Sequence, residues 1–187
     1  MARWEPNALE RLHTAAVELI GERGYHDTTA AGIAERAGLA KSTFFRHFAD
    51  KREALFFGQD LINEGLAGAI AAAPAGATPL AAVGDPLAAL TAAFPPERRA
   101  GARRRQAIID AHDELREREL LKRAAMTAAM AGALRDRGVP SATAALAAQI
   151  GDLALAMAYA RWLSSDADFA TLARDCLTEL RQASATL

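Results

Sequence analysis

Residues 28–55 constrain the fold of this 187-residue chain more than any other part of it. Apolar side chains at helical spacing around Ile33 predict a short helix with one buried side. Gly38 follows this helix and can adopt the left-handed conformation that ends it. In the next segment Phe44 and Phe48 lie four residues apart, so a second short helix would bury both on one side. Two short helices joined by a glycine turn are typical of a helix-turn-helix motif.

The other side of the second helix is mostly polar and would face away from the core. Such a helix can lie in the major groove of DNA, where its side chains contact the base edges. The residues on this outward side are Lys41, Ser42, Thr43, Phe45 and His47.

These residues and the segments around them are similar to the tetracycline-repressor (TetR) family of bacterial transcriptional regulators. Two positions depart from the family pattern. Ala40 stands where a serine usually caps the second helix of the motif, the recognition helix, and Phe45 stands where a tyrosine hydroxyl often contacts phosphate. The matching segments are Gly21–Tyr25, Thr28–Thr29, Ile33–Ala34, Ala37–Leu39, Thr43–Phe48 and Lys51–Leu55.

The resemblance implies a set of DNA contacts. Thr28 and Thr29 begin the first helix of the motif, and Lys51 and Arg52 begin the helix after it, where side chains bind the phosphate backbone. Each of these four residues alone is equally compatible with a helix cap or a solvated charge. The ring of Phe45 could pack on a thymine methyl group or on a sugar. The predicted DNA-contacting residues are Thr28, Thr29, Lys41, Ser42, Thr43, Phe45, His47, Lys51 and Arg52.

The formal net charge of −1 is unusual for a protein whose partner is a nucleic acid. Residues 36–52 differ from the rest, because they carry five lysines and arginines against the single carboxylate of Asp50. Binding to DNA requires positive charge at the docking face and not over the whole molecule.

Runs of β-branched residues are nearly absent, which predicts an all-α chain. We expect an N-terminal three-helix DNA-binding domain at residues 1–50 and a helical bundle for ligand binding and dimerisation at residues 51–187. Prolines and glycines between residues 74 and 86 predict a loose, flexible segment. Helices are expected at 6–23, within 28–48, at 50–73, 86–93, 97–111, 113–137 and 141–164, and from a cap at Asp166 to residue 183.

The expected helix at 141–164 is apolar on nearly all sides, so other protein must cover most of it. It is either a central core helix or half of a four-helix bundle between two subunits. The family resemblance favours the second alternative and assigns the last two helices to a homodimer interface. The interface residues expected on this basis are Ala144, Ala148, Gly151, Leu155, Trp162, Leu172 and Leu180.

The larger domain is also expected to hold a small-molecule effector. The segment with the arginines from Arg98 to Arg105 is similar to regulator domains thought to sense acyl-CoA-like molecules. Arginines can bind phosphates in a bidentate manner, so such a ligand is chemically reasonable. The alternative is that these arginines line a solvated helix face, and that the methionines nearby are ordinary core residues. The expected pocket residues are Leu61, Ile62, Leu66, Phe94, Arg104, Ile108, Ile109, His112, Met126, Met130 and Met157.

The sequence lacks the residue patterns typical of enzymes and of metal-binding proteins. The four histidines form no metal-ligand cluster, and no glycine-rich phosphate loop or catalytic pairing is present, so we expect no enzyme, no metal and no cofactor. The single cysteine, Cys176, and the absence of a leader segment predict a cytoplasmic protein. Asp152 and Arg161 interrupt the most apolar run, so we expect no membrane span.

Together these features predict a DNA-binding transcriptional regulator, most simply a repressor. It would bind a palindromic double-stranded DNA operator as a homodimer and be released by a small hydrophobic effector. The alternative is a regulator of the same fold that acts as an activator, or one without a small-molecule effector.

Overall fold

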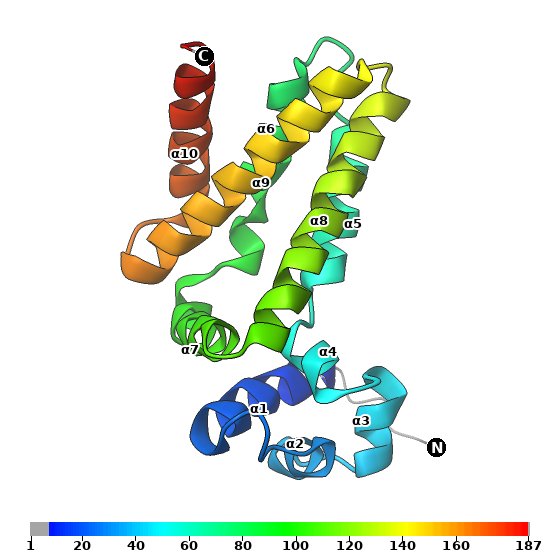
Figure 1. Ribbon diagram of the computed structural model, residues 1–187, viewed down its shortest axis with the longest axis vertical. Coiled ribbons are helices and arrows are strands. Elements are labelled where there is room, and N and C mark those ends of the chain that lie inside the picture. Colours follow the sequence, from blue (N-terminus) through cyan, green and yellow to red (C-terminus); the bar gives the residue numbers. More distant parts are fainter. Residues whose placement is uncertain (1–7, 187) are drawn as a thin grey trace. The chain divides into compact units, whose positions relative to one another are not determined.

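The computed structural model describes residues 8–186, except for the side chains of residues 60, 61, 91 and 92. Within this range the chain contains ten α-helices, two short 3-10 helices and no β-strand (Figure 1). The prediction of an all-α fold is confirmed. The chain forms two compact units. The first contains the described residues up to Gln59 together with Ala100–Glu117, and the second contains Asp60–Arg99 and the residues from Arg118 onward.

The first unit is built on four helices from the N-terminal part of the chain. These are α1 (Ala8–Arg23), α2 (Ala30–Arg36), α3 (Lys41–His47) and α4 (Lys51–Leu55). α2 and α3 form the predicted helix-turn-helix. Gly38 lies between them with φ of +66°, and the backbone N–H of Leu39 donates to the carbonyl oxygen of Ala34 at 2.8 Å. The left-handed glycine therefore closes α2 as the sequence predicted.

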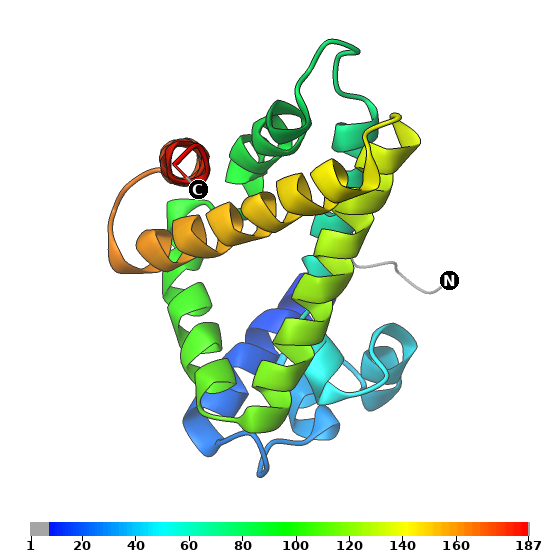
Figure 2. The same ribbon diagram turned by 45° about the horizontal axis from the view of Figure 1, so that its top comes forward.

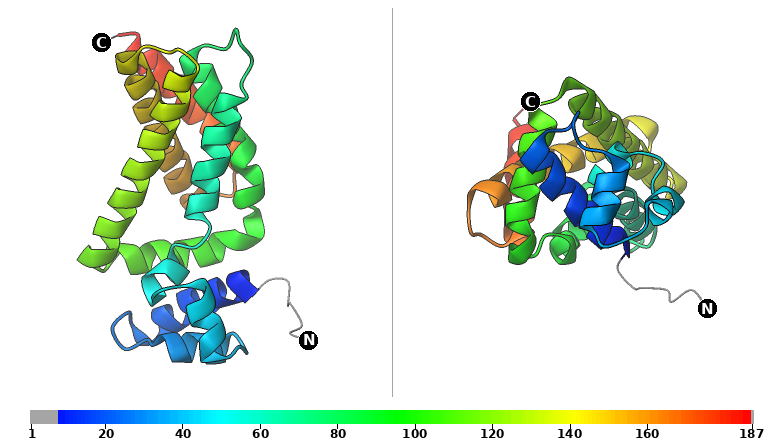
Figure 3. Two further views of the ribbon diagram at one scale, coloured as in Figure 1. Left: turned by 90° about the vertical axis from the view of Figure 1, so that its right-hand side faces the viewer. Right: turned by 90° about the horizontal axis from the view of Figure 1, so that it is seen from below.

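A segment from much later in the chain completes the core of this unit. Most of α7 (Arg99–Asp110) packs against the N-terminal helices, and Figure 3 shows this arrangement from two sides. Ile108, Ile109 and Leu115 are buried in the same hydrophobic core as Leu12 of α1 and Phe44 of α3. The division into domains at 1–50 and 51–187 stays a prediction, and within the first compact unit residues 100–117 pack with the N-terminal helices.

The helix expected at 50–73 is interrupted in the structure. α4 ends at Leu55, and α5 runs over Gln59–Ala71. Gly58 lies between them with φ of +89°, a conformation that is incompatible with a continuous right-handed helix. The apolar spacing on either side of Gly58 is helical, so periodicity alone predicted one helix where the backbone forms two.

Residues 74–78 lie outside the helices, but the prediction of a loose segment at 74–86 is wrong from Pro79 onward. α6 spans Pro79–Ala89 and is followed by the 3-10 helices Leu90–Ala93 and Pro96–Arg98. The side chain of Thr78 accepts a hydrogen bond from the backbone N–H of Ala81 at 3.2 Å, and Pro79 occupies the first turn. Threonine followed by proline is a favourable helix start. Burial of Val83 and Leu87 then holds α6 in the core.

Three long helices make up much of the second unit. They are α8 (Asp113–Asp136), α9 (Ser141–Ser164) and α10 (Phe169–Ser184), and α8 begins in the first unit. α6, α9 and α10 pack against one another, and Figure 2 shows α10 end-on beside the other two. The N-cap of α10 is Asp168 and not Asp166, because the Asp168 carboxylate accepts from the backbone N–H of Thr171 at 2.9 Å. Ser141 is the first residue of α9, and the cap position is Pro140.

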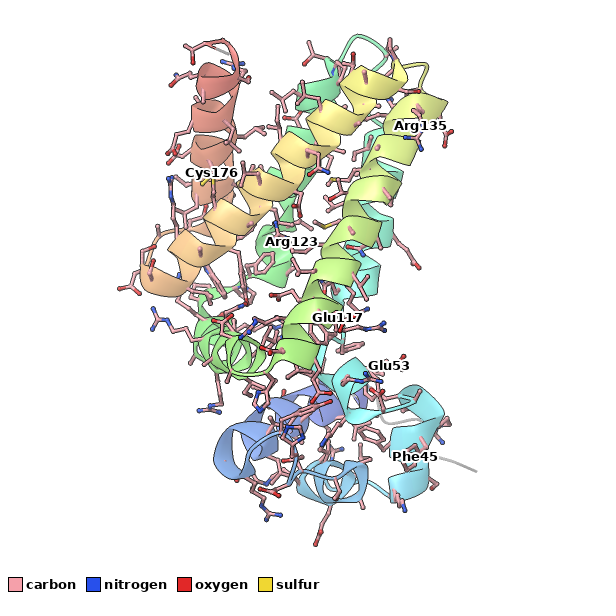
Figure 4. All side chains as sticks on the ribbon, in the orientation of Figure 1. Phe45, Glu53, Glu117, Arg123, Arg135 and Cys176 are labelled. Atoms are coloured by element: carbon pink, nitrogen blue, oxygen red, sulfur yellow. The ribbon has the colours of Figure 1, made fainter. Side chains whose placement is uncertain are left out.

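Charged pairs fasten the helices of the second unit to one another. The Arg123 guanidinium on α8 donates to both carboxylate oxygens of Asp152 on α9, at 3.2 and 2.7 Å (Figure 4). Arg161 of α9 makes a similar bidentate pair with Glu179 of α10, and these hydrogen bonds lower the pKa of the Glu179 carboxyl. Both pairs join neighbouring helices, so they fix register as well as proximity.

α9 is the one helix in the described part of the chain that is long and apolar enough to cross a membrane by length and composition. The core helix of a soluble protein meets the same criterion. Ala144, Ala148 and Gly151 of α9 are buried within this unit.

The close packing of α9 at Gly151 gives a testable prediction. A β-carbon at Gly151 would lie 2.4 Å from Cγ1 of the branched side chain of Val83. The substitution Gly151→Ala should therefore destabilise the protein by about 1–3 kcal/mol through overpacking. Gly132→Ala is the matched control in α8, since its β-carbon would lie 3.8 Å from the nearest atom, on Arg135. The control should be neutral or stabilising by up to about 1 kcal/mol. Equal urea midpoints for the two variants would contradict this packing.

Candidate DNA-binding face

The recognition helix α3 has one buried side and one exposed side, and the buried side orients it. Phe44 is fully buried and Phe48 is 5% exposed, which confirms the predicted inward side. Their rings pack 5.7 Å apart between centroids. Because these two rings are anchored in the core, the opposite side of α3 faces outward. Lys41, Ser42, Phe45 and Arg46 are exposed, and Thr43 and His47 are half-buried.

The start of α3 has the weak cap that its sequence predicted. Ala40 is the N-cap residue, and its side chain makes no hydrogen bond. The carbonyl oxygen of Ala40 accepts from the backbone N–H groups of Thr43 and Phe44 at 2.9 and 3.3 Å. The helix is therefore held in place mainly by burial of its phenylalanines and not by its cap.

The two threonines before α2 differ in their roles. Thr28 is only 2% exposed, and its hydroxyl oxygen lies 2.8 Å from the carbonyl oxygen of Gly24. Its side chain is thus part of the core and is unavailable for the predicted phosphate contact. Thr29 is exposed and caps α2, accepting from the backbone N–H of Gly32 at 3.1 Å. The cap alternative therefore describes Thr29 in this structure.

Lys51 points into the first unit and stabilises the turn before α2. Its ammonium nitrogen donates to the carbonyl oxygens of Tyr25 and Thr28, the latter at 3.0 Å. It also lies 4.1 Å from the centre of the Tyr25 ring. Burial, with a smaller effect of the nearby carboxylate of Glu114, raises the pKa of Tyr25 to about 12. A phosphate contact by Lys51 would break both hydrogen bonds, so we correct its assignment to a structural role.

The start of α4 is capped by its own carboxylates. The Asp50 side chain accepts from the backbone N–H of Glu53 at 2.9 Å, and the Glu53 side chain accepts from the backbone N–H of Ala49 at 3.0 Å. Arg52 donates to Asp50 at 2.7 Å on the surface. Burial alone would raise the pKa of Asp50, but the hydrogen bonds from Arg52 and Glu53 lower it. Arg52 is exposed and adjacent to the motif, where a phosphate could replace Asp50 as its partner.

Other cations of residues 36–52 are engaged within the first unit or exposed on α3. Arg36 makes a bidentate pair with Glu22 at 2.9 and 2.6 Å, which lowers the pKa of the Glu22 carboxyl. Lys41 and Arg46 are exposed on the recognition helix, and the Lys41 nitrogen lies 5.9 Å from the centre of the Phe45 ring. Sequence reasoning omitted Arg46, although its place between Phe44 and Phe48 would have put it on the outward side.

The residues predicted for an effector pocket are divided between the two units. Ile108 and Ile109 lie in the core of the first unit, with His112 beside Tyr25 and Arg104 over Gly21. In the second unit, Leu66, Met126 and Met130 are buried in the core, Ile62 packs against it, Phe94 stacks on Phe169, and Met157 is half-buried. The side chain of Leu61 lies outside the described residues.

The arginine cluster is also divided. Arg99 is buried, pairs with Asp166 at 2.9 Å and lies 5.1 Å from the centre of the Trp162 ring. Arg105 donates to the carbonyl oxygen of Leu55 at 3.0 Å in the first unit. Neither guanidinium can join a common phosphate clamp without breaking these contacts.

The residues predicted for the dimer interface lie largely inside the protomer. Ala144 and Ala148 are fully buried, Trp162 is 1% exposed, and Gly151 packs against Val83. They cannot form an exposed surface for a partner, so this part of the prediction is corrected. Leu155 packs against the same core, and Leu172 and Leu180 of α10 are half-buried. The exposed leucines of α9 are Leu146 and Leu153, which the sequence analysis did not select.

Two shallow hollows lie in the first unit. One runs beside α1 and the end of α2 and is lined mainly by charged residues such as Glu10, Glu18 and Arg36. The other lies beside His26 and His112. No group of three or more metal-ligating side chains is assembled among the described residues.

Comparison with known proteins agrees with this geometry. Residues 12–57 match the model of the family described as bacterial regulatory proteins, tetR family. The chain is 39% identical over 74 residues to the HTH-type transcriptional regulator TcmR of Streptomyces glaucescens. That match covers 40% of this chain and about a third (33%) of the length of TcmR.

Two solved structures share the fold over nearly the whole chain. The SmeT–triclosan complex superimposes with a TM-score of 0.63 and 19% identity, covering 95% of this chain and 91% of SmeT. A TetR-family regulator from Mesorhizobium loti superimposes with a TM-score of 0.60 and 19% identity, covering 96% of each chain. At this identity the likeness concerns the fold alone.

The helix-turn-helix with its outward polar face has the geometry of a DNA-binding segment. Residues 12–57, which include the whole helix-turn-helix, therefore resemble the DNA-binding part of the tetR family of bacterial regulatory proteins.

The position of Lys51 leads to a prediction that separates structural from DNA-binding roles. Lys51→Met removes two charged hydrogen bonds to backbone carbonyls and should destabilise the protein by about 1–3 kcal/mol. Lys41→Met is the matched control, because Lys41 is exposed on α3, and its stability should stay within about 0.5 kcal/mol of the parent. Thermal and urea unfolding measure both. Unchanged stability of Lys51→Met would return Lys51 to the set of phosphate contacts.

Proposed function

We propose that this protein is a cytoplasmic repressor that binds a palindromic operator as a homodimer and is released by a small hydrophobic effector. The observation that carries the proposal is the outward face of α3. Burial of Phe44 and Phe48 directs the other side of α3 to solvent, and that side carries two cations and two hydroxyl groups. This is the composition that major-groove contact requires.

The proposed contacts differ by position on the face. Ser42 and Thr43, in the first turn of α3, have hydroxyls that suit hydrogen bonds to base edges. Lys41, Arg46 and Arg52 suit the phosphate backbone, and His47 can contact either. Thr28 and Lys51 leave the set, since both side chains are engaged inside the unit. The contacts that we propose are Lys41, Ser42, Thr43, Phe45, Arg46, His47 and Arg52.

The homodimer is proposed to form through the exposed face of α9. Leu146 and Leu153 are 60% and 47% exposed, and their spacing of two helical turns places them on one side. Two bulky apolar side chains on one face cost free energy in water, and a second copy of the face would cover them. Two recognition helices would then reach half-sites about one turn of DNA apart.

The effector is proposed to be a small apolar molecule bound in the second unit. Met126 and Met130 give its core flexible side chains that can rearrange around a ligand. An acyl-CoA-like effector held by arginines is the less favoured form, because Arg99 and Arg105 already bind partners within their own units. SmeT, which shares the fold, was solved in complex with triclosan.

Sequence-specific binding of DNA is the direct test. A mobility-shift assay with the DNA upstream of its own gene, together with selection from a random duplex library, should yield a palindrome. Thr43→Ala should weaken binding to that palindrome by about 1–3 kcal/mol and weaken binding to random DNA less. Arg46→Ala is the matched control and should weaken both alike while lowering the salt slope by about one. Failure of the wild-type protein to select any sequence would reject the proposal.

The dimer surface is tested by a charge on either of two exposed leucines. Leu153→Glu should convert the protein to a folded monomer with unchanged helical content at micromolar concentration and abolish operator binding, because the side chain is exposed within the protomer. Leu121→Glu on α8 is the control, since Leu121 is 58% exposed but lies outside the proposed face. Sedimentation measures both. A dimeric Leu153→Glu variant beside a monomeric Leu121→Glu variant would move the interface to α8.

A further inference from the structure

Two histidines that are far apart in the sequence meet in the first unit. His26 lies in the turn between α1 and α2, and His112 lies at the junction of α7 and α8. The centres of their imidazole rings are 5.7 Å apart, with the ring planes at 66°. The buried ring of Tyr25 packs against both, at 5.5 Å from His26 and 5.4 Å from His112. The fold, and not sequence order, therefore brings the two imidazoles together.

The ring of His112 has one nitrogen engaged and one available. Its Nδ1 lies 2.8 Å from the carbonyl oxygen of Ile108 in α7. A carbonyl oxygen only accepts hydrogen bonds, so Nδ1 carries the proton, and in the neutral ring Nε2 keeps its lone pair. Histidines that bind metal ions are oriented by a hydrogen bond of this kind, from the second ring nitrogen to a carbonyl or carboxylate. Nε2 of His112 is thus presented as a metal ligand would be.

A carboxylate and an open hollow lie beside the two rings. One carboxylate oxygen of Glu114 is 4.0 Å from Nε2 of His26, and these side chains are 44% and 77% exposed, so both are free to rotate. The neighbouring Asp113 is already paired with Arg116. Glu114 is therefore the carboxylate best placed to join the histidines. The hollow is lined by His26, Ala111, His112, Asp113 and Glu114.

The distance between the two rings fits one shared ion. Zinc binds an imidazole nitrogen at about 2.0–2.1 Å and arranges its ligands tetrahedrally, so two imidazoles on one ion have ring centres roughly 5–6 Å apart. The rings of His26 and His112 are 5.7 Å apart. Three ligands are not yet gathered around one point among the described residues, so Glu114 has to rotate toward the rings to complete the set.

We propose that His26, His112 and Glu114 bind a divalent transition-metal ion, with zinc as the simplest probe. Imidazole nitrogens suit zinc, copper and nickel, whereas magnesium and calcium prefer sites made of oxygen ligands. Two histidines and one glutamate leave a fourth position for water. The bound ion would join the turn before α2 to the junction of α7 and α8, and so stabilise the unit that carries the recognition helix.

Zinc binding to the full-length protein, freed of any purification tag, is the direct test. Calorimetric titration of the wild type should show one ion per chain. Zinc should raise the temperature of thermal unfolding, and a chelator should reverse the shift. Magnesium at the same concentration should have no effect. Cobalt(II) in place of zinc supplies a spectroscopic signature, because its visible absorption depends on the number and type of its ligands.

Single substitutions assign the ligands. His26→Gln should weaken zinc binding by about a hundredfold or more, because losing a ligand costs more than losing the hydrogen bond that orients one. Unfolding of the metal-free His26→Gln variant should be nearly unchanged, because this side chain is largely exposed. His112→Gln should weaken zinc binding as much, and Glu114→Gln should weaken it less and alter the cobalt spectrum. His47→Gln on α3 is the matched control and should bind zinc as the wild type does.

Three results would overturn the inference. A wild-type protein that takes up no zinc at micromolar concentration would leave the rings as a packed aromatic cluster. Equal zinc affinities of His26→Gln and His47→Gln would place the ion elsewhere on the surface. An unchanged affinity and cobalt spectrum in Glu114→Gln would contradict the three-ligand site. None of these results bears on DNA binding, which operator selection tests separately.

Discussion

Burial of Phe44 beneath the recognition helix is the interaction on which the DNA-binding unit depends. α3 is seven residues long and lacks a side-chain cap, so its own backbone hydrogen bonds stabilise it little. The fully buried Phe44, with Phe48 beside it, supplies the missing free energy and determines which side faces solvent. Burial of Phe44 thus determines which of residues 41–48 face solvent.

The sequence predicted the motif closely because its signals are local. The glycine at 38, the spacing of Phe44 and Phe48 and the missing cap at Ala40 all act within a few residues, and the structure has each as expected. The helix interruption at Gly58 and the start of α6 at Thr78 were missed although they are also local. At both places a glycine or proline has two possible effects, and only the surrounding packing selects one.

Side-chain roles that depend on distant partners could not be predicted in this way. Lys51 looks like a surface cation until the carbonyl oxygens of Tyr25 and Thr28 are found around its nitrogen. The small residues of α9 were compatible with either a subunit interface or the core of one protomer. In the structure they are buried in the core of the protomer. Arg99 and Arg105 lie in one helix, and each is bound within a different unit. The sequence position of a small residue or of a long cationic side chain therefore says little about its structural role.

The insertion of residues 100–117 into the first unit has a consequence for engineering. Arg105 hydrogen-bonds to the carbonyl oxygen of Leu55 and covers the Phe56 ring, while Ile109 and Leu115 are buried in the core of that unit. A hybrid protein in which only the N-terminal helices α1–α4 are exchanged for those of a relative would pack the original α7 against helices that it did not evolve with. The apolar side chains of α7 would then no longer fit the core formed by the new N-terminal helices. Exchange of operator specificity should instead graft the few outward residues of α3, or transplant α1–α4 and α7 as a matched pair.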